Sequence, residues 1–228
     1  MLDLATPRGA IIAAAFRLAA ERPWEQLTLA DIAQAAGMTL LGLKKEFASK
    51  GEILAAFTAA VDDEVLARAP PRTPEQPARD ALFEVIMCRF DVLAPHKKAL
   101  RSVVRNAIPE PAHIRPLLAS QRWMLEAAGV ASDGLGGTLK IAGLTTVYAS
   151  VFRTWLADDD PGHARTMAAL DRRLRRGERA LGQISAVCSG LARFASAARP
   201  RGFGSRPSSQ EPAPATPDEP RTGPAAGI

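Results

Sequence analysis

The sequence has few aromatic residues, few cysteines and no long hydrophobic run, and each shortage excludes a class of protein. Aromatic residues make up 5% of the 228 residues, and alanine and leucine dominate the 47% that are hydrophobic. This composition suits packed helices better than strands. No window approaches the roughly 18 apolar residues of a membrane span. The N-terminus also lacks the basic start and apolar run of a signal peptide, so we expect a cytoplasmic protein.

The residue types that carry out chemistry are sparse and scattered. Cys88 and Cys188 lie far apart in apolar stretches, and we interpret both as buried reduced thiols. His96, His113 and His163 have no cysteine or carboxylate at ligand spacing, which argues against a metal site. The chain has no Ser/His/Asp order, no paired carboxylates with a base and no glycine-rich phosphate loop. We therefore expect neither an enzyme nor a bound cofactor.

The net charge of +5 is unevenly distributed along the chain. In residues 1–60 six basic residues are balanced by six acidic ones. Residues 164–206, in contrast, contain ten arginines against Asp171 and Glu178. The basic surface therefore lies near the C-terminus, away from the segment that would have to attract nucleic acid.

The first 65 residues are predicted to form helices, because apolar residues recur at helical spacing between start and stop signals. The first helix covers residues 8–21. Thr28 can cap a second helix, with Asp31 three residues later in a capping-box arrangement, and Gly37 ends it. Thr39 can cap a third helix. The predicted helices begin near residues 8, 28, 39 and 49.

The rest of the chain is predicted to be helical as well, after a break at Pro70, Pro71, Pro74 and Pro77. The expected helices are 79–94, then about 97–107, 112–128, 137–156 and 163–182, with a last apolar stripe over 184–199. The turn signals between them are Pro109 and Pro111, Gly129, residues 134–137 and residues 158–162. We interpret the acidic run Asp158–Asp160 as a solvated turn before a helix. From Pro200 onward the chain holds seven of its 18 prolines, which predicts disorder.

Residues 28–47 have the pattern of a helix-turn-helix, two short helices joined by a tight turn. Gly37 tolerates the turn conformation, Ala33 allows a close helix approach, and Ile32 and Leu43 supply apolar anchors. This segment resembles the tetracycline-repressor (TetR) family, and the resemblance spans about residues 5–65. It implies a recognition helix over Thr39–Lys45 and phosphate contacts by Thr28 and Lys50. The DNA-binding residues expected from it are Thr28, Thr39, Leu40, Leu41, Gly42, Lys44, Lys45 and Lys50.

The recognition helix departs from the family's usual residues. Leu41, Gly42, Leu43 and Lys44 stand where the family usually has glycine or alanine, then threonine, leucine and tyrosine. Leu40 and Leu41 are apolar where a base-reading helix commonly presents hydrogen-bonding groups. The alternative interpretation is an inherited helix-turn-helix that no longer reads DNA.

Residues 79–182 are predicted to form a second helical domain for ligand binding and dimerisation. Over about residues 79–176, in stretches such as LFEVIMCRFDVLAPHKKAL and WMLEAAGV, the chain resembles the lipid-binding accessory family of ubiquinone (coenzyme Q) biosynthesis, which has a TetR-like fold. Large apolar residues on these helices could line a cavity or could simply form the core. They include Phe83, Met87, Met124, Leu139, Leu144 and Val147. The candidates for ligand binding are Phe90, Trp123, Tyr148, Phe152 and Trp155.

Two functions are compatible with these patterns in an all-α, TetR-like protein. The first is a homodimeric transcriptional regulator that binds operator DNA and responds to a small apolar ligand. The alternative is a lipid-binding accessory protein of ubiquinone biosynthesis, holding an isoprenoid ligand, with a relic helix-turn-helix. Residues 183–199 either pack as a final helix or, through 184–199, contact the inner face of the membrane peripherally. The domains expected are 5–65, 79–182, the helix 183–199 and the tail 200–228.

Overall fold

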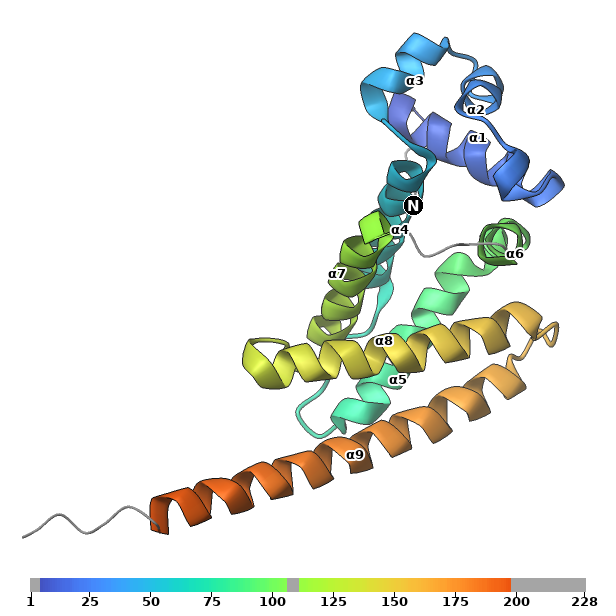
Figure 1. Cartoon of the computed structure of the whole chain (residues 1–228). Coiled ribbons are helices and arrows are strands. Elements are labelled where there is room, and N and C mark those ends of the chain that lie inside the picture. The colour runs from blue at the N-terminus through green and yellow to red at the C-terminus, as the bar shows by residue number, and fades with distance from the viewer. Residues whose placement is uncertain (1–4, 106–110, 198–228) are drawn as a thin grey trace, which may run out of the picture. The chain divides into compact units, whose positions relative to one another are not determined.

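A computed structural model of the chain describes residues 5–105 and 111–197 (Figure 1). Throughout this part the regular elements are helices, which confirms the all-α prediction. The α-helices are α1 (Pro7–Glu21), α2 (Leu29–Ala35), α3 (Leu40–Glu46), α4 (Lys50–Arg68), α5 (Ala78–Leu93), α6 (Lys97–Arg105), α7 (Pro111–Ala127), α8 (Gly134–Ala157) and α9 (Ala164–Ala197). Short 3-10 helices η1 (Trp24–Gln26) and η2 (Ala94–His96) precede α2 and α6. None of these helices is both long and apolar enough to cross a bilayer.

The predicted helix starts are confirmed at the atomic level. Thr28 and Asp31 form a reciprocal capping box at the start of α2, and the Thr39 hydroxyl accepts from the Gly42 amide at the start of α3. Ser49 caps α4 in the same way. Each such cap satisfies an amide that the helix itself cannot pair and stabilises the helix by about 1 kcal/mol. The caps therefore fix where these short helices begin.

The first three helices and the start of α4 share one apolar core. Ile32 and Leu43, the predicted anchors, are both fully buried. Phe16 of α1 stacks on Phe57 of α4 with ring centroids 3.8 Å apart, and the His96 ring meets both edge-on. Because α4 continues beyond this core, it is the helix that joins the N-terminal module to the rest of the chain (Figure 1).

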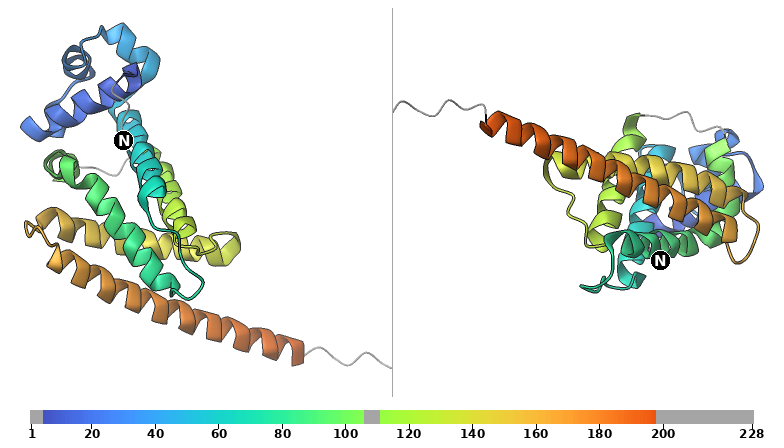
Figure 2. Two further views of the ribbon diagram at one scale, coloured as in Figure 1. Left: turned by 180° about the vertical axis from the view of Figure 1, so that it is seen from behind. Right: turned by 90° about the horizontal axis from the view of Figure 1, so that it is seen from below.

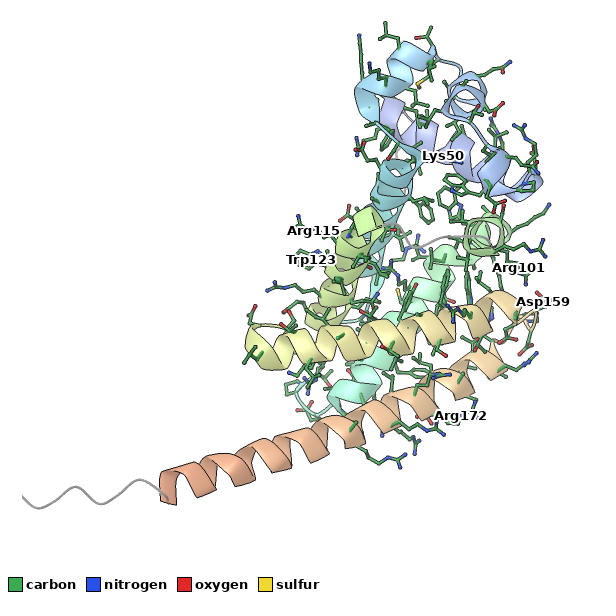
Figure 3. All side chains as sticks on the ribbon, viewed as in Figure 1. Lys50, Arg101, Arg115, Trp123, Asp159 and Arg172 are labelled. Carbon is green, nitrogen blue, oxygen red and sulfur yellow. The ribbon has the colours of Figure 1, made fainter. Side chains whose placement is uncertain are left out.

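A second connection to the module runs through α6, which packs against α1. The Ser102 hydroxyl accepts from the Trp24 amide at 2.9 Å and donates to the Arg22 carbonyl at 3.1 Å. On the other side of α6, Arg101 donates to the Leu156 carbonyl and pairs with Asp159, close to the end of α8 (Figure 3). A cation at a helix C-terminus binds its unpaired carbonyls favourably. The helix α6 thus links the end of α8 to the N-terminal module.

The helices behind the N-terminal module pack around α4, α5, α7 and α8, and they belong to the same compact unit as the module. The helix α4 packs against α5 and α7, and α7 packs against α8. Figure 1 and the left view of Figure 2 show α8 crossing α5, and four aromatic side chains stack at that crossing. The expected turn at residues 134–137 is instead the first turn of α8, which begins at Gly134 with a positive φ of 66°.

The C-terminal helix differs from the expected pair of helices, 163–182 and 183–199. The backbone forms one helix, α9, from Ala164 to Ala197, because a glycine such as Gly182 only weakens a helix by about 1 kcal/mol. The last part of α9, from Val187 onward, belongs to a different compact unit from the residues up to Ala186. The predicted amphipathic face of 184–199 and the disordered tail 200–228 concern side chains and residues outside those that the structure describes, so both stay predictions.

The acidic run before α9 begins with a buried cap, Asp158, whereas Asp159 and Asp160 are exposed, so the interpretation of a solvated turn before a helix holds for two of the three residues. The Asp158 side chain accepts from the Thr166 hydroxyl at 2.7 Å and from the Thr166 amide at 3.0 Å, and the residue is almost fully buried. The hydrogen bond from the Thr166 hydroxyl lowers the pKa of Asp158, and the two backbone amides of Thr166 and Asp160 add to the effect. Asp160 accepts from the Ala164 amide as well. The run therefore closes the start of α9.

A loss of stability at low pH follows from this cap. The folded pKa of Asp158 lies below the unfolded value of about 3.9. The stabilisation by Asp158 is therefore complete above the unfolded pKa and is lost as the pH falls through the folded pKa. We expect Thr166→Val, which removes the hydroxyl donor, to lower the thermal midpoint at pH 7 and to differ less from the parent at pH 3. Thr146→Val, which removes a hydroxyl that bonds only the Ala142 carbonyl, should give a difference that does not depend on pH. A pH-independent difference for both variants would contradict the assignment.

Candidate nucleic-acid interface

The turn between α2 and α3 has the geometry that a helix-turn-helix requires. Gly37 has a positive φ of 70°, a conformation that side chains rarely adopt. The amide of Met38 reaches back to the Ala33 carbonyl at 3.0 Å, and the Gly37 amide to that of Gln34 at 3.0 Å. These bonds satisfy the last carbonyls of α2 and turn the chain directly into α3. The predicted turn at Gly37 is confirmed.

The outward face of α3 brings four of the predicted DNA-binding residues together. Leu40 and Leu41 are 53% and 66% exposed, although Leu43 of the same helix is fully buried. Lys44 and Lys45 are also exposed and form no hydrogen bond or ion pair with any residue that the structure describes. Residues four apart share a helix face, so Leu40 lies beside Lys44 and Leu41 beside Lys45. The face is therefore half apolar and half cationic.

The two predicted threonines are occupied inside the module. The Thr28 hydroxyl donates to the Asp31 carboxylate at 2.7 Å and accepts from the Asp31 amide. This donor from Thr28 lowers the pKa of Asp31. The Thr39 hydroxyl caps the Gly42 amide at 3.1 Å. Both side chains thus position the two helices. The spacing of these threonines in the sequence does not distinguish this capping role from a phosphate contact.

Lys50 differs from the predicted phosphate contact. Its ammonium donates to the Trp24 carbonyl at 2.9 Å and to the Leu27 carbonyl at 2.8 Å, and it lies 5.1 Å from the centre of the Trp24 ring (Figure 3). These carbonyls belong to η1 and the loop after it, far away in sequence. Lys50 therefore holds this loop against α4. Nothing in the sequence distinguishes such a clamp from a lysine that faces DNA.

The predicted ligand-binding residues fall into two places. Phe90, Tyr148, Phe152 and Trp155 stack on one another with neighbouring ring centroids 5.2 to 5.8 Å apart, and they fill the crossing of α5 and α8. Trp123 is 52% exposed on α7 and is not part of this stack (Figure 3). Phe90, Tyr148 and Trp155 are buried in the core and Phe152 is partly buried against it, and burial raises the pKa of Tyr148.

A groove between α5, α7, α8 and α9 offers the space that a ligand needs. Its volume is about 340 Å³. Its apolar lining residues are Leu82, Leu125, Val130, Leu139, Leu144, Val147 and Leu174. Leu139, Leu144 and Val147 are among the apolar residues that the sequence offered for a cavity. The others come from α5, α7, α9 and the loop after α7, which periodicity within one helix cannot bring together.

The fold and the exposed face of α3 define a helix-turn-helix protein with a TetR-like fold. Residues 11–57 match the family model of bacterial regulatory proteins, tetR family, so this part of the chain is similar to the N-terminal domain of that family. The expected TetR resemblance of the N-terminal module is confirmed.

Solved structures support the same fold over most of the chain. A TetR transcriptional regulator from Nitrosomonas europaea is 26% identical, with a TM-score of 0.59, and the match covers 75% of this chain and 97% of that one. For a regulator from Rhodococcus sp. RHA1 the identity is 18%, the TM-score 0.57 and the coverages 75% and 95%. A tetR-family transcriptional regulator from Streptomyces coelicolor is 18% identical, with a TM-score of 0.52, and the match covers 86% of this chain and 93% of that one. No curated protein matches. The likeness of residues 79–176 to the ubiquinone accessory family stays a prediction.

Proposed function

We propose that the protein is a TetR-type transcriptional regulator that binds operator DNA through α2 and α3. The exposed face of α3, with two leucines and two unpaired lysines, is the observation that carries this proposal. A recognition helix enters the major groove and needs such an outward face. The module has few free cations, so specific contacts must contribute more than non-specific attraction. The role requires binding and no catalysis, and it places the protein with the DNA in the cytoplasm.

The salt dependence of DNA binding tests which lysines meet phosphates or bases. Lys44→Ala should weaken binding to operator DNA and reduce the slope of log affinity against log salt by about one unit. Lys98→Ala, at an exposed position on α6, is the matched control and should leave the slope unchanged. Lys50→Ala should lower the free energy of unfolding, because two carbonyls lose their donor, with little change in slope. An unchanged slope for Lys44→Ala would contradict the assignment.

A homodimer is part of the proposal, because one short recognition helix reads only a few base pairs. Helix-turn-helix dimers bind two half-sites about 34–36 Å apart. The helix α8 exposes Leu135 at 92%, and α9 exposes Met167 at 38%. Such apolar side chains on adjacent helices suit a subunit interface. Membrane contact through residues 184–199 is not part of the proposal.

The proposed effector is a small apolar molecule bound in the groove. The groove volume of about 340 Å³ lies at the small end of the range for ligand pockets, roughly 300–1,000 Å³. Its lining is mostly leucine and valine, with Lys140, Arg79 and Glu178 among the polar residues. A ligand with a compact apolar body and one polar end fits this arrangement.

A glycine in the groove provides a direct test of ligand binding. A Cβ added at Gly143 would meet no atom within 4 Å, so the first atom of a larger side chain is tolerated there and Gly143→Leu should extend into the groove. We expect this variant to lose both the ligand that co-purifies with the parent, seen by native mass spectrometry, and the rise in melting temperature on adding it. Gly136→Leu has equally free space but lies outside the groove, so it should keep both. Equal ligand retention by the two variants would contradict the proposed site.

A further inference from the structure

The exposed leucines of α3 are an unusual feature of this surface. Leu41 is 66% exposed and Leu40 is 53% exposed, on a helix whose inward residue, Leu43, is fully buried. No described side chain covers them, and they lie side by side in the first turn of α3. Adjacent large apolar side chains that face water lower solubility and gain nothing for the fold. The pair therefore fits a partner that buries it.

The surroundings of the pair identify the charge of that partner. Lys44 and Lys45, one turn further along the same face, have no ion-pair or hydrogen-bond partner among the described residues. Arg8 and Arg17, the cations of α1, instead donate to the carbonyls of Glu46 and Ala35. The surface next to the leucines is thus free to bind anions, as a nucleic-acid backbone requires.

The polar groups near the pair leave few other ways to distinguish bases. The Thr28 hydroxyl both donates and accepts in its capping bonds, and the Thr39 hydroxyl is held as the acceptor of the Gly42 amide, which leaves it a single donor. Gly42 has no side chain, and an added Cβ would meet only Thr39 Oγ1 at 3.5 Å and Met38 atoms at 3.7 and 3.9 Å. No contact inside the protein therefore requires a glycine at this position. A glycine beside the leucines suits a close approach of α3 to the groove floor.

We infer that Leu40 and Leu41 read thymine by burying its C5-methyl group in the major groove. Among the base edges in the major groove, this methyl is the distinctive apolar group, and all four base pairs otherwise present hydrogen-bond donors and acceptors. Two leucines cannot pair with those donors and acceptors, but they can cover methyl groups. The operator half-site should therefore carry thymines beneath the first turn of α3, with guanine or phosphate contacts for Lys44 and Lys45. This inference rests on the proposed DNA-binding function.

The test removes single methyl groups from the DNA. The full-length protein is used to select operator sequences from a random duplex pool, and each thymine of the selected half-site is then replaced by deoxyuridine. Fluorescence anisotropy should show about a four-fold loss of affinity at the thymines beneath the pair, since a buried group of this size contributes roughly 0.8 kcal/mol. In Leu41→Ala or Leu40→Ala the same replacement should have little further effect, because the methyl has lost its partner.

Controls separate this inference from the proposed function. Leu117→Ala changes an exposed leucine of α7, outside the module and outside the proposed subunit interface, and should keep the full loss on deoxyuridine replacement. Far-UV circular dichroism with a thermal melt confirms that each variant is folded. Selection of a half-site in which no thymine responds to deoxyuridine would overturn the inference but leave the DNA-binding function intact. Selection of no sequence at all, or a leucine pair that instead mediates self-association or binds another protein, would overturn both.

Discussion

Asp62→Asn is expected to lower the free energy of unfolding by about 3–5 kcal/mol, because it leaves the buried Arg89 without a counter-charge. Both side chains are largely buried, and the Arg89 guanidinium pairs directly with the Asp62 carboxylate. Asp62 also accepts from Ser120 at 2.7 Å, and Arg89 donates to the Tyr148 hydroxyl at 3.1 Å. Burial alone would lower the pKa of Arg89, but the facing Tyr148 and Asp62 raise it, so the charge persists.

The double variant distinguishes loss of the ion pair from loss of packing. Asp62→Leu with Arg89→Met removes both charges and should recover most of the lost stability, since apolar residues of similar volume often replace a buried pair at little cost. Urea denaturation at fixed protein concentration gives the free energies of unfolding. A single variant within 1 kcal/mol of the parent would show that the pair is not buried as described. The network also joins α4, α5, α7 and α8, so its loss should weaken the attachment of the helix that leads to the DNA-binding module.

Gly137→Ala is expected to destabilise the protein by about 3 kcal/mol, the upper end of the range for overpacking. Gly137 is buried in the first turns of α8, and an added Cβ would lie 2.0 Å from the Ser132 carbonyl oxygen. The Ser132 backbone cannot retreat easily, because its side chain bonds Glu126 and the neighbouring Asp133 pairs with Arg122. The change thus forces two backbone segments apart.

The neighbouring glycine is the matched control for this effect. Gly136 is exposed and has nothing within 4 Å of an added Cβ, so Gly136→Ala should leave stability unchanged or raise it by up to about 1 kcal/mol. The comparison uses thermal or urea unfolding of both variants on the same scale. Equal stability of the two variants would contradict the close approach of the Ser132 backbone to Gly137.

Local signals in the sequence predicted the fold well. The caps at Thr28, Thr39 and Ser49 and the turn at Gly37 depend on residues within a few positions of one another, and the structure has all of them. The glycines at 134–137 were a weaker signal, since glycine occurs both in turns and where a helix lies close to another segment. Only the packing of Ser132 shows which applies at Gly137.

The site was harder to predict, because its residues act through contacts distant in sequence. Lys50 resembles a phosphate contact by position, but its ammonium is bound by two carbonyls more than 20 residues away. The aromatic residues of α5 and α8 recur at a helical spacing that would also suit the lining of a cavity, but their rings stack on one another. In both cases the role of the side chain depends on which surface the neighbouring helices cover. Periodicity within one helix does not predict that surface.

The central claim is that the chain reads DNA sequence through α3. The most direct measurement compares the affinity of the full-length protein for a selected operator duplex with that for a scrambled duplex of equal length, at physiological salt. The account predicts binding to the operator at least 10³-fold tighter, the lower end for specific recognition. Equal affinity for the two duplexes would contradict it, and the helix-turn-helix would then be a scaffold that no longer reads DNA.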